Sequence, residues 1–448
     1  MLRPALAMAV GVILLCSTAP ALAQQQTHPR IVIQQIATTH APLPNGGKES
    51  RTQEQVQREA ERTRSAYTAK ADDYRNGHVL GYDRITYAEC VKNKDSGRPG
   101  GWVKNHFAWC GQFGEKWIAQ RCNDDGCVPG GYLDLHYVII GQGHHGPVPG
   151  STTDRYMTFD VKIDYLVNTD LFQTPGTTWG TRMDCLGKDS SKCKPSALAS
   201  KPLSEWSVKP DASFQITSPA KPPTKNDEQR LYADVKQTSD ARIPGAVPEG
   251  GPLSGAVTSI RFDSAQYIQK NGNTGTDPLG SIFTKADPFL TYSDDIGTEY
   301  VEVADHIKLA LDRPGETKPP FSDKQIPGGG WGNPLHRLAA SLSDENTKRR
   351  DRNRYYSKKA CDKYYPGWDI PKDPRDGKSI EQCDEFPFAS TLEGAARFLP
   401  EYDGPRFENM FSARPVHRDD NGAAGRVLAD WYDWDRILHG DPFFVKVE

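Results

Sequence analysis

The sequence predicts a multidomain protein: an all-β, sandwich-like amino-terminal domain and a small α+β carboxyl-terminal domain. Apolar and polar residues alternate along residues 132–140 and 156–167, a pattern typical of half-buried strands. The 448 residues include 40 Gly and 34 Pro, a composition that favours strands joined by turns. Towards the carboxyl end, helical and extended stretches follow one another, which predicts a compact mixed unit.

Changes in composition divide the chain into five segments. Arg3, the apolar residues 6–15 and the small residues 21–23 are typical of a secretory signal peptide. No later segment is apolar for long enough to cross a bilayer, so we expect a secreted protein. The predicted segments are a signal peptide (1–23), a polar helical or flexible stalk (24–79), a disulfide-bonded β domain (80–218), an irregular or β-rich extension and linker (219–330), and the carboxyl-terminal domain (331–448).

The cysteine content also indicates export. Of the nine cysteines, Cys16 lies in the predicted signal peptide, and the even number that remains favours disulfides. A zinc site at Cys122 and Cys127 is the alternative, but no second Cys or His pair stands at ligand spacing. Pairing each cysteine with its neighbour along the chain gives Cys90–Cys110, Cys122–Cys127, Cys185–Cys193 and Cys361–Cys383.

The carboxyl-terminal domain has its own order of predicted elements. Residues 343–360 form a charged helical pattern with Ser343 as a candidate N-cap. After them we expect a strand at residues 396–399, a helix at 421–432 and a final strand at 442–447. Earlier in the chain, residues 123–126 (Asn-Asp-Asp-Gly) predict a tight turn between two strands.

An acidic cluster in the last domain carries the strongest chemical signal. Asp384 and Glu385 are adjacent in a run of aromatic residues and Pro, and Glu393 follows nine positions after Asp384. Buried carboxylates are costly unless they are paired or bound to a metal, and hard divalent cations prefer oxygen ligands. Candidate ligands are Asp384, Glu393 and Asn421, with Glu385 as a candidate general base. Alternatively, one of the adjacent carboxylates forms an internal salt bridge, Glu393 is an ordinary loop residue and Asn421 is an N-cap.

A basic run within residues 343–360 fits a polyanionic partner. The net charge of the chain is −3, so any attraction to nucleic acid must be local. A basic helix can neutralise phosphates without reading bases, although a solvated surface helix is the alternative. The candidate DNA-binding residues are Arg349, Arg350, Arg352, Arg354 and Lys358.

Histidines give weaker signals. His336 is a candidate proton donor, but isolated histidines are more often structural or exposed. His144 and His145 lie in a Gly-rich run, which predicts a surface loop rather than a metal site.

The acidic motif and its surroundings resemble the secreted NucA/NucB deoxyribonuclease family. That family has an Asp-Glu-aromatic-Pro motif, a Glu-Gly pair, an Arg-aromatic pair, an Asp-Asn helix start and a closing apolar strand. The corresponding residues are, in order, Asp384-Glu385-Phe386-Pro387, Glu393-Gly394, Arg397-Phe398, Asp420-Asn421 with Gly425, and Phe443-Phe444-Val445. Gln382-Cys383 stand where many relatives have Arg-Asp, which leaves the metal-ligand set open.

The resemblance implies a secreted, metal-dependent, sequence-nonspecific endonuclease that hydrolyses DNA with Mg²⁺ or Mn²⁺. It implies catalytic roles for Asp384, Glu385, Glu393 and Arg397, with Glu385 standing where related metal nucleases have a His base and Arg397 stabilising negative charge. DNA is then the partner of the carboxyl-terminal domain, whereas the ligand of the β domain is unknown. The alternatives are an extracellular binding protein with a non-catalytic nuclease-like domain, and an exported nuclease toxin with a neutralising partner protein.

Overall fold

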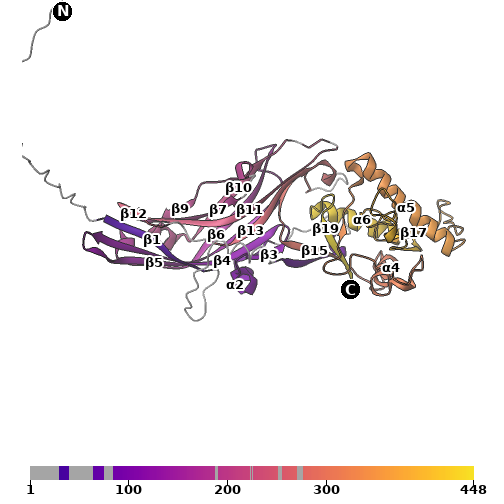
Figure 1. Ribbon diagram of the computed structural model, residues 1–448, viewed down its shortest axis with the longest axis horizontal. Coiled ribbons are helices and arrows are strands. Elements are labelled where there is room, and N and C mark those ends of the chain that lie inside the picture. Colours follow the sequence, from indigo (N-terminus) through magenta and orange to yellow (C-terminus); the bar gives the residue numbers. More distant parts are fainter. Residues whose placement is uncertain are drawn as a thin grey trace, which may run out of the picture.

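The computed structural model describes residues 30–39, 64–74, 84–186, 190–221, 223–224, 226–250, 255–269 and 276–448. The predicted signal peptide and most of the predicted stalk lie outside these residues. Among the helices of the described residues, none is long and apolar enough to cross a membrane. A long β-rich portion continues at one end into a more helical carboxyl-terminal portion (Figure 1).

Thirteen strands of the β-rich portion form one curled, half-barrel sheet, which is mostly antiparallel. The main path is β12-β1-β4-β5-β14-β13-β11-β7-β9, and β3, β6, β8 and β10 pair beside it. The strands are β1 (Arg30–Thr39), β3 (Trp102–Asn105), β4 (Ala108–Asn123), β5 (Gly126–Pro147), β6 (Asp154–Asn168), β7 (Thr178–Leu186), β8 (Lys194–Pro195), β9 (Ala199–Pro202), β10 (Asp211–Pro219), β11 (Glu228–Arg242), β12 (Ala246–Pro248), β13 (Val257–Ala265) and β14 (Leu279–Phe283). Two short helices, α2 (Tyr87–Lys92) and α3 (Leu203–Val208), accompany them.

The alternating sequences form strands as predicted, but not a sandwich. Residues 132–140 and 156–167 lie in β5 and β6, and the predicted turn joins β4 to β5. The two-sheet sandwich expected at residues 80–218 is replaced by the single sheet, to which β1 and β11–β14 also belong. Long strands twist, and a twisted sheet of this length curls around one core. Trp109, Phe159 and Trp179 are fully buried in that core.

The carboxyl-terminal portion combines a four-stranded sheet, a hairpin and three helices. The sheet order is β16-β19-β15-β2, and β17 pairs with β18. Its elements are β2 (Ser65–Lys70), β15 (Ala286–Tyr292), α4 (Val301–Asp312), β16 (Leu335–His336), α5 (Asp344–Tyr364), β17 (Glu381–Phe386), β18 (Ser412–His417), α6 (Arg418–Trp434) and β19 (Pro442–Val447). The chain therefore enters the large sheet with β1, leaves it for β2, returns for β3–β14 and leaves again for β15–β19.

Three of the expected elements in this portion are confirmed and two are wrong. Helices α5 and α6 and strand β19 form where predicted, and the Ser343 side chain caps α5 by accepting a hydrogen bond from the Asn346 N–H. Residues 396–399 form turns instead of a strand. Residues 65–70, which local composition assigned to a helical or flexible stalk, form β2, because pairing with β15 outweighs a weak local preference.

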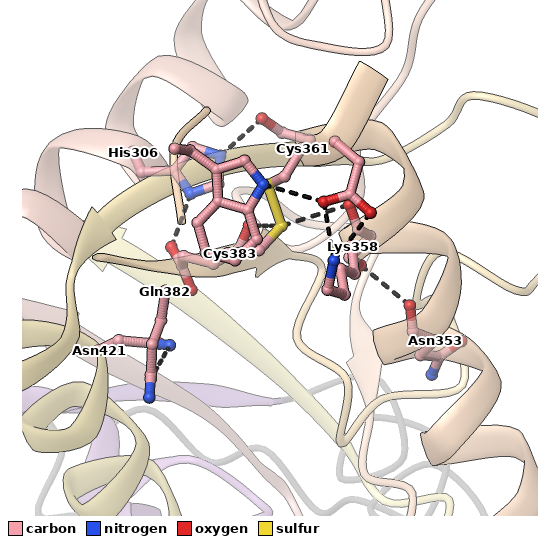
Figure 2. The surroundings of a disulfide bond; sticks show 12 residues. His306, Asn353, Lys358, Cys361, Gln382, Cys383 and Asn421 are labelled. Atoms are coloured by element: carbon pink, nitrogen blue, oxygen red, sulfur yellow. Dashed lines mark hydrogen bonds and ion pairs between the residues drawn. A yellow bond between two sulfur atoms is a disulfide. The ribbon is translucent and has the colours of Figure 1, made fainter. Parts of the chain in front are cut away.

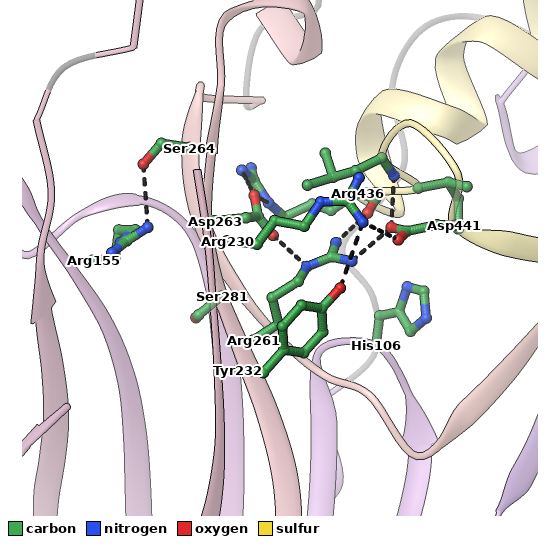
Figure 3. Close-up of polar contacts among 12 residues, drawn as sticks. His106, Arg155, Arg230, Tyr232, Arg261, Asp263, Ser264, Ser281, Arg436 and Asp441 are labelled. Carbon is green, nitrogen blue, oxygen red and sulfur yellow. Dashed lines mark hydrogen bonds and ion pairs between the residues drawn. The ribbon is translucent and has the colours of Figure 1, made fainter. Parts of the chain in front are cut away.

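Buried ion pairs join the two portions (Figure 3). Arg436, which follows α6, donates to Asp263 of β13 through Nε (2.9 Å) and Nη2. Arg261 of β13 contacts Asp441 (Nη1–Oδ2, 2.6 Å), and both Arg436 and Asp263 are fully buried. A Cβ at Gly280 would lie 2.4 Å from the Arg436 guanidinium, so only glycine leaves room there. His145 Nε2 donates to Trp434 O (2.8 Å) in this interface, so the expected surface loop at His144 and His145 is wrong.

Candidate functional site

The β17–β18 hairpin places the acidic motif in the carboxyl-terminal portion. Asp384 lies opposite Arg414 and Glu385 opposite Ala413. A disulfide between Cys361 of α5 and Cys383 ties this strand to the helix immediately before Asp384 (Figure 2). All four neighbour pairings of cysteines expected from the sequence are present. The disulfide therefore fixes the distance between the acidic motif and α5.

A groove of about 730 Å³ is lined by β17. Its lining comes mainly from α5, β17 and α6, together with Tyr267, Val303 and residues 337–341. Asp384, Glu385 and Asn421 all line it, as do Arg350, Arg354 and Lys358. The structure thus gathers three of the predicted acidic-site residues and three of the predicted basic residues around one concave surface.

Asp384 is held from its buried side by a histidine. His306 of α4 is fully buried, and its Nδ1 lies 2.6 Å from Asp384 Oδ2. The other ring nitrogen, Nε2, lies 2.6 Å from Ser412 Oγ of β18. In the neutral ring, Nδ1 donates to the carboxylate and Nε2 accepts from the serine hydroxyl. Asp384 itself is 5% exposed, so its carboxylate has a fixed direction and limited access to solvent.

Glu385 has the proton affinity expected of a general base near neutral pH. Burial, followed by the negative charge of Asp384, raises its pKa from 4.5 to about 8, although Arg354 and the Ala389 N–H oppose the change. The Ala389 N–H lies 3.2 Å from Glu385 Oε1 and orients the carboxylate. A base whose pKa lies near the working pH transfers protons most effectively.

This raised pKa predicts a pH-dependent stability difference between the wild type and Glu385→Gln. In chelator, the folded wild type keeps a proton on Glu385 up to about pH 8, whereas the unfolded chain releases it near 4.5. The folded state then binds more protons, so this group lowers the free energy of unfolding as pH rises from 4.5 to 8. We expect urea unfolding at pH 5.5 and 8 to show that the free energy of unfolding of Glu385→Gln rises relative to that of the wild type. The rise should be at most about 1.4 kcal/mol per pH unit. If the difference in free energy of unfolding between the variant and the wild type stays constant with pH, the raised pKa of Glu385 is contradicted.

Asn421 lies inside the first turns of α6 and not at its N-cap, a position that His417 occupies. Its Nδ2 donates to Gln382 Oε1 (3.0 Å), as Figure 2 shows. The amide oxygen of Asn421 is the atom that a cation would use. Gln382 therefore orients the asparagine side chain.

Glu393 and Arg397 have partners outside the residues that line the groove. Glu393 accepts from the His336 backbone N–H (2.9 Å) and contacts His336 Nδ1 (2.8 Å). The hydrogen bond to Glu393 raises the pKa of His336. Arg397 donates to Asp403 (2.6 Å) and lies over the Phe407 ring. These residues and His336 are not among the residues that line the groove with Asp384 and Glu385.

The basic residues of α5 divide between two faces of the helix. Arg350, Arg354 and Lys358 follow one another at intervals of four and line the groove together. Arg349 donates to Leu392 O (2.5 Å) and Arg352 pairs with Glu401, so both contact the segment after the acidic motif. Lys358 pairs with exposed Asp362. Such surface pairs are worth roughly 0–1 kcal/mol, so a phosphate can replace the carboxylate.

A buried asparagine, which sequence reasoning missed, shapes the segment after the motif. Asn353 of α5 is fully buried and donates through Nδ2 to Ala389 O (3.0 Å) and Thr391 O (3.1 Å). A Cβ at Gly394 would lie 2.3 Å from Asn353 Nδ2, so the glycine allows this segment to pack closely against α5. An Asn at an inward position of an otherwise charged helix is the only sequence signal for this contact.

The donors around the groove fit a hard divalent cation. Among the described residues, no three His, Cys, Asp or Glu side chains form a cluster with metal-binding geometry. Mg²⁺ is commonly held by only one or two carboxylates together with water and substrate phosphate. Burial first, and then the negative charge of Asp384, raise the pKa of Glu385, and a cation between the two carboxylates would relieve their repulsion.

Comparison with known proteins supports the resemblance. The family model described as Deoxyribonuclease NucA/NucB matches residues 334–446. Comparisons with curated proteins and with solved structures gave no match. The matched segment includes α5, the β17–β18 hairpin, α6 and nearly all of β19, but not α4, β15 or β2. The resemblance carried by the acidic motif is thereby confirmed, and residues 334–446 are similar to the NucA/NucB deoxyribonucleases.

Proposed function

We propose that the protein is an exported, divalent-metal-dependent endonuclease that hydrolyses DNA without sequence preference. The observation that carries the proposal is one groove lined both by Asp384, Glu385 and Asn421 and by the basic row Arg350, Arg354 and Lys358. The family match over residues 334–446 supports DNA as the substrate. Four disulfides are consistent with an oxidising compartment.

Each of the groove residues can have a separate role in phosphodiester hydrolysis. Glu385 removes a proton from the attacking water, since its pKa lies near neutral pH. Asp384 and the Asn421 amide oxygen are the groups that would hold Mg²⁺ or Mn²⁺. When bound, such an ion neutralises charge on the scissile phosphate. With Glu393 and Arg397 engaged elsewhere, charge stabilisation from the protein falls to Arg354, which lines the groove and interacts electrostatically with Glu385.

Sequence-nonspecific binding follows from the chemistry of the basic row. Charged side chains spaced by four along a helix contact the sugar–phosphate backbone at regular intervals. Affinity should therefore fall with increasing salt for any DNA sequence. A double variant, Arg350→Gln with Arg354→Gln, would reduce the slope of that salt dependence.

Incubation of the purified protein with supercoiled plasmid tests the proposal. We expect nicking in Mg²⁺ or Mn²⁺ and loss of nicking in chelator, restored by adding the cation back. Retarded DNA with no cleavage under any divalent cation would contradict the enzyme and support an extracellular DNA-binding protein. Cleavage that persists in chelator would contradict the metal requirement alone.

A further inference from the structure

Helix α4 reaches the candidate site from outside the segment that matches the family model. It spans residues Val301–Asp312, whereas the match begins at residue 334. Its inward face is apolar, with Val303, Ile307 and Ala310 buried, and His306 is the buried polar residue within that face. A polar ring buried among apolar residues is costly unless both nitrogens are hydrogen-bonded. Both nitrogens of His306 are, and one of the partners is Asp384.

The contacts of His306 join the two strands of the hairpin. Asp384 belongs to β17 and Ser412 to β18, and in the register of the hairpin they are diagonal neighbours. The imidazole therefore fixes Asp384 with respect to both strands. His306 occupies Oδ2 only, and no described residue hydrogen-bonds Oδ1. Asp384 Oδ2 is thus engaged by His306, whereas Oδ1 is available to a ligand in the groove.

The same helix also contacts the start of α6, which carries Asn421. The Glu302 carboxylate accepts from the His417 N–H (2.6 Å) at the start of α6, and the Glu302 N–H donates to Asp420 Oδ2 (3.1 Å). Asp420 immediately precedes Asn421, the second residue proposed as a cation ligand. Two residues of α4, one turn apart, therefore set the positions of Asp384 and of the helix turn that carries Asn421.

We propose that His306 is a positioning residue of the nuclease site: it holds Asp384 Oδ2 so that Oδ1 faces a divalent cation in the groove. The inference rests on the proposed function, which it deepens by assigning part of the site to α4. Removal of a residue that hydrogen-bonds and orients a metal ligand typically weakens metal affinity by about 10–100-fold. His306 does not touch the reacting atoms in this arrangement.

Mn²⁺ affinity, measured by electron paramagnetic resonance on the full chain, tests the assignment. His306→Leu should weaken Mn²⁺ binding by about 10–100-fold. His306→Asn should restore most of the affinity, because the asparagine Nδ2 can donate to Asp384 Oδ2 as the imidazole Nδ1 does. Rescue by asparagine distinguishes an orienting hydrogen bond from simple packing.

A matched control comes from His106. It is also buried, and its Nδ1 contacts Asp435 O (2.7 Å), but it lies at the interface with the β-rich portion and not at the groove. His106→Leu should lower stability and leave Mn²⁺ affinity unchanged. The assignment is overturned if His306→Leu keeps wild-type affinity, if His306→Asn fails to rescue, or if the wild type binds no Mn²⁺. The proposed function is judged separately, by plasmid cleavage with the wild type.

Discussion

Glu385→Gln should lower the rate of DNA cleavage by about 10²–10⁴-fold, the range that a general base contributes. Glutamine has nearly the same shape as glutamate and can still contact the Ala389 N–H, but it cannot take a proton from water. DNA binding should persist, because the basic row of α5 is untouched. Single-turnover cleavage of a labelled duplex, together with a binding isotherm, separates the two effects.

Glu381→Gln is the matched control for this variant. Glu381 is the first residue of β17 and is not among the residues that line the groove. The substitution makes the same chemical change in the same strand, four residues away. Equal losses in the two variants, or full turnover in Glu385→Gln, would reject Glu385 as the base.

Arg436→Met should destabilise the protein by about 3–5 kcal/mol, the cost of leaving one partner of a buried ion pair alone. Burial by itself would raise the pKa of Asp263, but Arg436 and Arg261 outweigh burial and hold that pKa below its usual value. Removing Arg436 leaves the fully buried carboxylate with one arginine and empties the space beside Gly280. Guanidinium unfolding of the disulfide-intact protein measures the change.

Arg242→Met is the comparison that isolates burial in this prediction. Arg242 also pairs with an aspartate, Asp240 (2.6 Å), two residues earlier in the chain, but its own side chain is 79% exposed. A pair of that kind contributes roughly 0–1 kcal/mol. If Arg436→Met proved no more harmful than Arg242→Met, the interface network would not be a source of stability.

The parts of the fold that could be predicted are those encoded locally. The helix at α5 begins at a serine cap before a charged stretch, and β5 and β6 alternate over many residues, so each pattern reports its own environment. Cysteine pairing by neighbours succeeded because each pair closes a short loop within one region. The acidic motif was found because adjacent carboxylates among aromatic residues are unusual.

The parts that could not be predicted depend on distant partners. Residues 65–70 become a strand only because β15, more than two hundred residues later, offers an edge for pairing. The expected strand at 396–399 gives way to turns where the Ala396 N–H donates to the buried Asn353 side chain (3.0 Å). His306 was missed because a single histidine on an apolar helix face does not reveal its partner. Its place among the apolar residues Val303, Ile307 and Ala310, at helical spacing, was the available sequence signal.

Because the chain passes repeatedly between the two sheets, the unfolding of one sheet affects the other. Strand β2 precedes, and β15 follows, nearly all of the large sheet along the chain, yet they are neighbours in the small one. Unfolding of the half-barrel would free the chain segments that keep β2 and β15 paired. The large sheet and the four-stranded sheet should therefore unfold together. Calorimetry should accordingly register one heat-absorption peak, and a fragment limited to residues 334–446 should not attain a stable fold.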